Sequence, residues 1–221
     1  MNDRALKIYF AGDLFDAKDL MGNLLLAAAI EQHARGRYQI MLPQDGECEV
    51  ADRSSQSIRD ADFELLFSCD IILANFDGTD LDSGTVAEFC FAKMLDMPAV
   101  LLRTDFRDAG DHTLPDGEPW NLMCSHYPRT VVRHINAMEI YHQSRACAPD
   151  RCQDAFYSML AAEIVAALDA VCAEKSWLQA DELAAQYQRA IKSIGGSLSS
   201  RFPQERVAQI VAAKAASGIY S

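Results

Sequence analysis

Short apolar runs that alternate with helical patterns are the feature that most constrains the fold of this chain. The runs begin at Leu6, Tyr38, Asp70, Met97 and Thr130. Between them lie segments whose apolar residues recur at helical spacing. Strand alternating with helix predicts a doubly wound α/β fold, with a flavodoxin-like parallel five-stranded sheet in the order 2-1-3-4-5.

The segments between the apolar runs predict the rest of this domain. Helices are expected over residues 20–33, from Ser55 or Ser57 to about Cys69, and from about Gly84 to Asp96. Pro98 suits the first position of the fourth strand. The stretch 104–128 is rich in Asp, Gly and Pro and predicts a long loop, which in a compact domain is usually functional or disordered.

Ligands of such sheets bind beyond the carboxyl ends of the strands, where the strand order reverses. Here that position lies between the first and third strands. Two loops therefore meet there: "AGDLFD" at 11–16, and an acidic turn around Asp77, Asp80, Asp82 and Glu88.

Charge and composition exclude several classes of partner. The formal net charge is -12, and Lys and Arg form no cluster, so nucleic acid is not expected as a ligand. Seven scattered cysteines without a Cys-x-x-Cys pair favour neither a disulfide framework nor a zinc site, and suggest a reducing cytoplasm. No signal peptide and no apolar stretch of about 18 residues is evident, so no membrane segment is expected.

After about residue 146 the sequence becomes an alanine-rich series of helices. We expect residues 1–145 to form the α/β domain and residues 146–221 to form a helical extension. Its apolar stripes have acidic rather than basic polar faces, which favours packing on the domain or on a neighbouring subunit over binding to a membrane.

Glu88 allows two interpretations. Thr85 and Glu88 have the spacing of a capping box, in which two side chains satisfy free backbone amides at a helix start. This reading accounts for the spacing by itself, and it predicts that Glu88→Gln preserves the helix start. It does not account for Asp82 in the adjacent Ser-Gly turn or for the other acids of the loop.

Asp62 lies on the side of its helix that is expected to face inward. A carboxylate there is costly unless it is paired or used. The alternative is that the helix is rotated and Asp62 reaches solvent. If Asp62, Asp82 and Glu88 converge, they suggest glycoside chemistry, with one carboxylate as nucleophile and another as acid or base. A magnesium site at Asp77, Asp80 and Asp82 is the rival reading.

The sequence resembles the nucleoside 2-deoxyribosyltransferase family. The resemblance rests on "KIYFAG", on "IRDADFELLFSCDIILANFDG" and on "DSGTVAEFCFAKMLDMPAVLL", which is close to the family pattern Asp-x-Gly-Thr-x-x-Glu. It extends from about Lys7 to about Ile140. The chain departs from the family pattern at Cys90, which stands where the family usually has Gly, and in the length of its C-terminal extension.

The resemblance implies roles for four residues. Glu88 is the nucleophile that forms a covalent deoxyribosyl intermediate, and Asp62 assists proton transfer to and from the base. Asp82 holds the sugar 5′-hydroxyl, and Tyr9 lies near the nucleophile. No metal and no cofactor is expected.

The remaining expected substrate contacts come from several loops. Gln44 matches a nucleobase contact, while Asn121 and Met123 match an Asn-Leu-Met that the family lends from a neighbouring subunit, so a homo-oligomer is expected. The aromatic ring of Phe15 can stack on a base. The substrate-binding set also includes residues of the two loops: Gly12, Asp77 and Gly84.

The expected activity is exchange of nucleobases on 2-deoxyribonucleosides. Related nucleotide N-glycosidases usually have a serine where Asp82 stands, and Asp82 would repel a 5′-phosphate by about 1 kcal/mol even in bulk water. Hydrolysis of nucleosides or nucleotides is the first alternative. A non-catalytic module that senses nucleotides and Mg²⁺ is the second.

Overall fold

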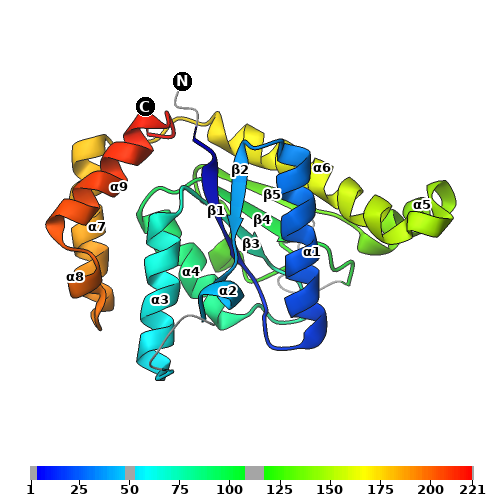
Figure 1. The fold of residues 1–221 in the computed structure, drawn as a ribbon, viewed down its shortest axis with the longest axis horizontal. Coiled ribbons are helices and arrows are strands. Elements are labelled where there is room, and N and C mark those ends of the chain that lie inside the picture. Colours follow the sequence, from blue (N-terminus) through cyan, green and yellow to red (C-terminus); the bar gives the residue numbers. More distant parts are fainter. Residues whose placement is uncertain (1–3, 48–52, 108–116, 221) are drawn as a thin grey trace.

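A computed structural model describes residues 4–47, 53–107 and 117–220 of the chain. Within these residues the predicted sheet is confirmed: five parallel strands are hydrogen-bonded in the order β2-β1-β3-β4-β5 (Figure 1). The fold is a flavodoxin-like α/β fold. The strands are β1 (Leu6–Ala11), β2 (Tyr38–Met41), β3 (Ile71–Asn75), β4 (Ala99–Arg103) and β5 (Thr130–His134).

Burial of the strands follows their apolar sequence. All five residues of β4 are buried, as are the first four of β3, because a parallel sheet is covered by helices on both faces. The edge strand β5 is only partly buried, and Val132 is exposed. The core therefore lies around the three middle strands of the sheet.

Helices cover both faces of the sheet. On one face α1 (Ala17–Ala34) packs against α6 (Cys152–Cys172), which also contacts β4 and β5. On the other face α3 (Ser55–Ser68) and α4 (Ser83–Met94) pack on β1, and α4 also contacts β3 and β4. The shorter α2 (Pro43–Glu47) follows β2, and a 3₁₀ turn η1 (Leu122–Cys124) precedes β5.

One helix differs from the expectation that no segment is long and apolar enough to cross a membrane. By length and composition alone, the helix over Pro149–Cys172 is long and apolar enough to do so. Its apolar residues instead contact α1 and the sheet, and seven residues of α6 are buried: Leu160, Ala161, Ile164, Val165, Ala167, Leu168 and Val171. In this structure α6 is thus a covering helix of the core.

The last three helices lie beside α3. They are α7 (Ala180–Ile194), α8 (Leu198–Arg201) and α9 (Gln204–Ala216), and α8 contacts α3 while α7 contacts α4 (Figure 1). The helix α5 (Ala137–Cys147) and the turn η2 (Pro149–Arg151) connect β5 to α6. The division of the chain at residue 145 stays a prediction.

Candidate active site

The loops after β1 and β3 lie side by side, as the topology predicts. Ala11 and Ala74 are register partners at the ends of these strands. A Cβ atom added to Gly12 would lie 3.2 Å from the Cβ atom of Asn75, which is tighter than ordinary van der Waals contact. Gly12 therefore allows the first loop to pass close to the end of β3.

A hydrogen bond joins Tyr9 of β1 to Glu88 of α4. The Tyr9 hydroxyl donates to Oε1 of Glu88 at 2.5 Å, and the tyrosine side chain is fully buried. Charged acceptors give short, strong hydrogen bonds. This hydrogen bond joins β1 to α4 through two residues that lie 79 positions apart in the sequence.

Burial and neighbouring carboxylates raise the pKa of Glu88. Desolvation is the largest cause, and the charges of Asp62 and Asp82 add to it, while the hydrogen bond from Tyr9 opposes it. The pKa rises from 4.5 to about 8. Burial also raises the pKa of Tyr9, and the charges of Glu88 and Asp62 raise it further. The structure therefore brings Tyr9, Asp62, Asp82 and Glu88 within electrostatic reach of one another.

The capping interpretation of Glu88 is wrong. Helix α4 begins at Ser83 and its N-cap is Asp82, whose Oδ2 accepts hydrogen bonds from the Thr85 backbone N–H at 2.6 Å and from the Thr85 hydroxyl at 2.8 Å. Glu88 lies in the second turn of the helix, where no free amide needs a cap. Its carboxylate is bound by Tyr9 instead.

Gly84 allows Asp82 to fold back over the helix start. A Cβ atom at this position would lie 3.0 Å from Oδ2 of Asp82. Only Oδ2 of Asp82 is bound by Thr85, and Oδ1 makes no hydrogen bond within the described part of the chain. One oxygen of Asp82 is thereby left for a further donor.

Asp13 is a carboxylate that the sequence interpretation missed. Burial raises its pKa, and the charges of Asp82, Asp19 and Asp77 raise it further, so it belongs to the same acidic group. Its position gave a usable signal, since it directly follows Gly12 at the carboxyl end of β1.

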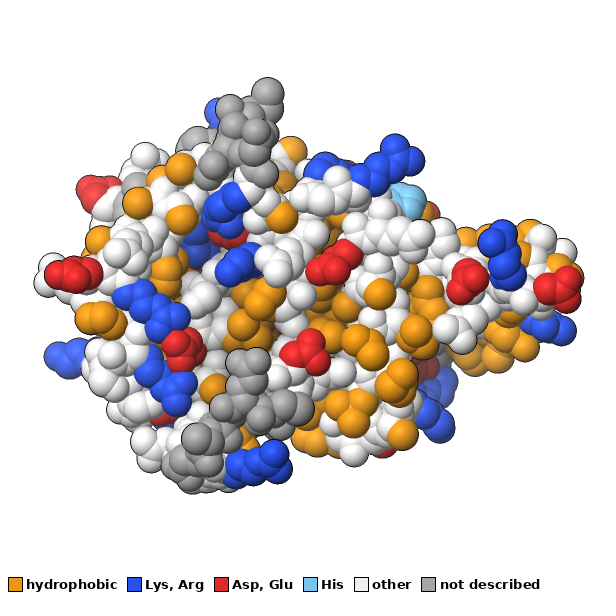
Figure 2. All heavy atoms as spheres, viewed as in Figure 1, with side chains coloured by type: hydrophobic (Ala, Val, Ile, Leu, Met, Phe, Trp, Pro, Cys, Tyr) orange, Lys and Arg blue, Asp and Glu red, His pale blue; other side chains and the backbone are white. Residues whose placement is uncertain are grey.

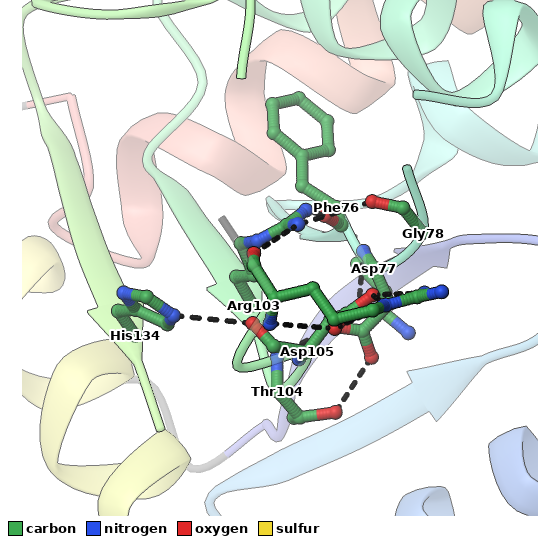
Figure 3. Close-up of polar contacts among 9 residues, drawn as sticks. Phe76, Asp77, Gly78, Arg103, Thr104, Asp105 and His134 are labelled. Atoms are coloured by element: carbon green, nitrogen blue, oxygen red, sulfur yellow. Dashed lines mark hydrogen bonds and ion pairs between the residues drawn. The ribbon is translucent and has the colours of Figure 1, made fainter. Parts of the chain in front are cut away.

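Asp77 connects the ends of β3 and β4 (Figure 3). Its Oδ2 accepts a hydrogen bond from the Thr104 hydroxyl at 2.6 Å, and its Oδ1 accepts from the backbone N–H groups of Thr104 at 2.5 Å and of Asp105 at 2.8 Å. Both of its oxygens are thus engaged. The expected contact of Asp77 with substrate stays a prediction.

Arg103 binds the backbone of the same turn. Its buried guanidinium donates to the carbonyl oxygens of Phe76 at 2.5 Å and Gly78 at 3.0 Å (Figure 3). Gly78 has a φ of +101°, a conformation that side chains rarely adopt. These contacts fix the path of the acidic turn without using its carboxylates.

The magnesium alternative finds no ligand set among residues 4–47, 53–107 and 117–220. No group of three or more His, Cys, Asp or Glu side chains in these ranges is arranged to hold a metal ion. Asp77 is occupied by Thr104 and Asp105, and one oxygen of Asp82 by Thr85.

Asn121 and Met123 line a cavity beside the acidic turn. The cavity has a volume of about 590 Å³, and Asp80, Ser83 and Trp120 also line it. Met123 is 70% exposed, and Asn121 caps η1 by accepting a hydrogen bond from the Met123 N–H. Their expected part in the site of a neighbouring subunit stays a prediction.

Gln44 lies on α2 and Phe15 in the loop after β1. The Gln44 amide donates to the carbonyl oxygen of Leu20 at 3.1 Å and so connects α2 to α1. Phe15 is 76% exposed in the loop after β1. Their expected contacts with a nucleobase stay predictions.

The Glu88 group can hold a proton near neutral pH. Burial is the main cause that raises the pKa of Glu88 to about 8, so this carboxyl keeps a proton at higher pH than an ordinary glutamate does. Such a group can supply an ionised nucleophile and a protonated acid at the same time.

A comparison with known protein families gives one match. The sequence profile of a family described as nucleoside 2-deoxyribosyltransferase matches residues 8–123, which is more than half of the chain. None of the curated proteins matches.

Two solved structures are similar at low identity. A conserved protein from Enterococcus faecalis V583 is 23% identical, with a TM-score of 0.44, and the match covers 76% of this chain and 95% of that one. A 2-deoxyribosyltransferase from the psychrotolerant bacterium Bacillus psychrosaccharolyticus is 22% identical, with a TM-score of 0.38, and the match covers 47% and 77%.

Proposed function

The chain belongs to the nucleoside 2-deoxyribosyltransferase family, and from this we propose that it exchanges nucleobases on 2-deoxyribonucleosides through a deoxyribosyl intermediate on Glu88. The observation that carries the proposal is the partly buried Glu88, bound by Tyr9 and influenced by the charges of Asp62 and Asp82. These are the residues to which the family resemblance gives the catalytic roles.

In the first half of the reaction, an oxygen of Glu88 attacks C1′ of the deoxyribose. The C1′–O bond forms as the C1′–N bond to the base breaks, and the electron pair goes to the base nitrogen. Asp62 gives its proton to the departing base. The reaction needs Glu88 ionised and Asp62 protonated, which is one proton shared between the two carboxyl groups.

In the second half, a nitrogen of the acceptor base attacks C1′. Glu88 leaves as a carboxylate, and the proton of the base nitrogen returns to Asp62. The Tyr9 hydroxyl stabilises the carboxylate of Glu88 by its hydrogen bond, both before attack and on departure. Oδ1 of Asp82 receives the 5′-hydroxyl of the sugar, while Oδ2 stays on Thr85.

The proposal includes a cytoplasmic homo-oligomer. Asn121 and Met123 are exposed and line a cavity beside the acidic turn. We assign them to the site of a neighbouring subunit, with no metal and no cofactor required.

Incubation with deoxyinosine and adenine tests the function. Formation of deoxyadenosine and hypoxanthine supports base transfer, and Glu88→Gln should abolish it. Release of free deoxyribose without deoxyadenosine would replace transfer by hydrolysis. If neither product forms, the catalytic proposal is wrong.

A further inference from the structure

Helix α3 lies between the candidate site and the C-terminal helices. Asp62 acts on Glu88 and Tyr9 from one side of α3. Asp60 and Glu64 are each two residues from Asp62, which on a helix of about 3.6 residues per turn places them on the opposite side. That opposite side is covered by α8 and the segments next to it.

The turn before α8 binds Asp60. Its carboxylate is fully buried and accepts hydrogen bonds from the Ser197 backbone N–H at 2.6 Å and from the Ser197 hydroxyl at 2.8 Å. Gly196 has a φ of +61°, and a Cβ atom there would lie 2.4 Å from Oδ2 of Asp60. The turn therefore approaches α3 as closely as a glycine allows.

Further contacts follow along α3. Glu64 accepts hydrogen bonds from Arg201 and Arg206, both at 2.6 Å. In the space-filling view, basic side chains lie beside an acidic one in the region where the C-terminal helices meet α3 (Figure 2). The Tyr187 hydroxyl donates to the Phe67 carbonyl at 2.9 Å, and the Lys214 ammonium donates to the carbonyl of Cys69 at the C-cap.

We propose that the C-terminal helices act as a clamp on α3, in which Gly196 and Ser197 are positioning residues that hold Asp60 and thereby present Asp62 to Glu88. Neither residue touches the substrate. The inference rests on the proposed function, because it gives the extension a part in the proton transfer assigned to Asp62.

Small displacements of Asp62 have two consequences. Misplacement of a catalytic group by about 1 Å can reduce the rate about 100-fold. The charge of Asp62 also helps to raise the pKa of Glu88, together with Asp82 and against the hydrogen bond from Tyr9. If Asp62 moves away, the pKa of Glu88 falls.

A matched pair of serine variants separates positioning from stability. Ser197→Ala removes a hydroxyl that donates to Asp60 at 2.8 Å, and Ser176→Ala removes one that donates to the equally buried Asp96 at 2.7 Å. Both hydroxyls belong to the C-terminal part of the chain, but only the first binds α3. Both variants should lower the thermal midpoint by similar amounts.

Only Ser197→Ala should change the chemistry. We expect its kcat for base exchange to fall about 5-fold to 10-fold with KM nearly unchanged, and Ser197→Thr, which keeps the hydroxyl, to restore kcat. Gly196→Ala should reduce kcat further, by about 10-fold to 100-fold, since its methyl group displaces the Asp60 carboxylate.

A titration that needs no turnover completes the test. The side-chain carboxyl of Glu88 is followed by ¹³C NMR against pH and assigned with Glu88→Gln. Its midpoint should fall in Ser197→Ala and stay unchanged in Ser176→Ala. If the wild-type protein exchanges no bases, the proposed function fails while this titration still decides on the clamp. An unchanged kcat and an unchanged midpoint in Ser197→Ala would overturn the clamp.

Discussion

Two groups of buried or partly buried carboxylates in this protein differ in their partners. At the candidate site, Glu88 is bound by a neutral tyrosine and faces the charges of Asp62 and Asp82. Around the C-terminal helices, carboxylates are paired with arginines: Asp60 with Arg59, Glu64 with Arg201 and Arg206, Asp70 with Arg4, and Asp96 with Arg129. Among the described ion pairs, none involves Glu88 or Asp82.

Glu88 in the first group, and Glu64 and Asp70 in the second, have pKa values shifted in opposite directions. Burial raises the pKa of Glu88, and its acidic neighbours raise it further. Burial also acts on Glu64 and Asp70, but hydrogen bonds from Arg206 and Arg4 outweigh it and hold both pKa values below normal. Paired carboxylates stabilise the fold, while an unpaired, crowded one is retained at a cost in stability and points to chemistry.

The largest expected effect is the loss of activity in Glu88→Gln. Removing the nucleophile should reduce base exchange at least about 10³-fold, because no other described side chain replaces the covalent step. Glu139→Gln, the same substitution on the exposed α5, is the control and should leave the rate unchanged. Turnover of Glu88→Gln near the wild-type rate would contradict the assigned role.

The converse variant is Asp96→Asn at the other group. It leaves the Arg129 guanidinium, which is 2% exposed, without its counter-charge, and should lower the free energy of unfolding by about 3 kcal/mol. Denaturant unfolding measures the loss. The rate of base exchange per folded molecule should stay the same. A large loss of that rate would contradict the distinction between the two groups of carboxylates.

Stability against pH should show two separate losses. Glu88 has a folded pKa of about 8 above its unfolded 4.5, so its contribution is present below pH 4.5 and is lost as pH rises toward 8, by about 5 kcal/mol. Glu64 and Asp70 have lowered folded pKa values, so their contribution is lost as pH falls through those values.

Glu88→Gln is the informative variant for this profile. It should remove the loss between pH 4.5 and 8 and leave the acid loss in place. Thermal unfolding from pH 3 to pH 9 measures both. A wild-type profile that is flat from pH 5 to pH 8 would show that Glu88 is not held protonated.

Tyr9→Phe should have a smaller effect than Glu88→Gln. The lost hydroxyl stabilised the ionised form of Glu88, so the pKa of Glu88 should rise and the rate at neutral pH should fall about 10-fold. The rate should recover toward higher pH. A pH profile of the rate that is unchanged by the substitution would show that Tyr9 does not influence the pKa of Glu88.

The sequence predicted the fold well because its signal is local. The predicted strand at Leu6–Ala11 is the observed β1, and the strand order is the predicted one. Continuous apolar runs specify buried parallel strands without knowledge of their neighbours. The start of α4 at Ser83 was predicted to within about a residue, but its cap is Asp82 and not Thr85, because a Thr-x-x-Glu spacing also occurs away from helix ends.

Long-range partners could not be predicted. The Tyr9–Glu88 hydrogen bond spans 79 residues and the Asp60–Ser197 contact spans 137, so no local pattern announces them. The family resemblance supplied Asp62, Asp82 and Glu88 as candidates. It did not supply Asp13, or the close approach of Gly196 to α3, which depends on how the extension packs.

The most direct test of the account is the titration of the Glu88 carboxyl in the ligand-free protein. Selective ¹³C labelling of glutamate, with Glu88→Gln to assign the signal, follows this one group across pH 3 to pH 10. The account predicts a midpoint at about 8. A midpoint near 4.5, the ordinary value for a glutamate, would contradict it, because Glu88 would then be neither buried nor crowded by Asp62 and Asp82.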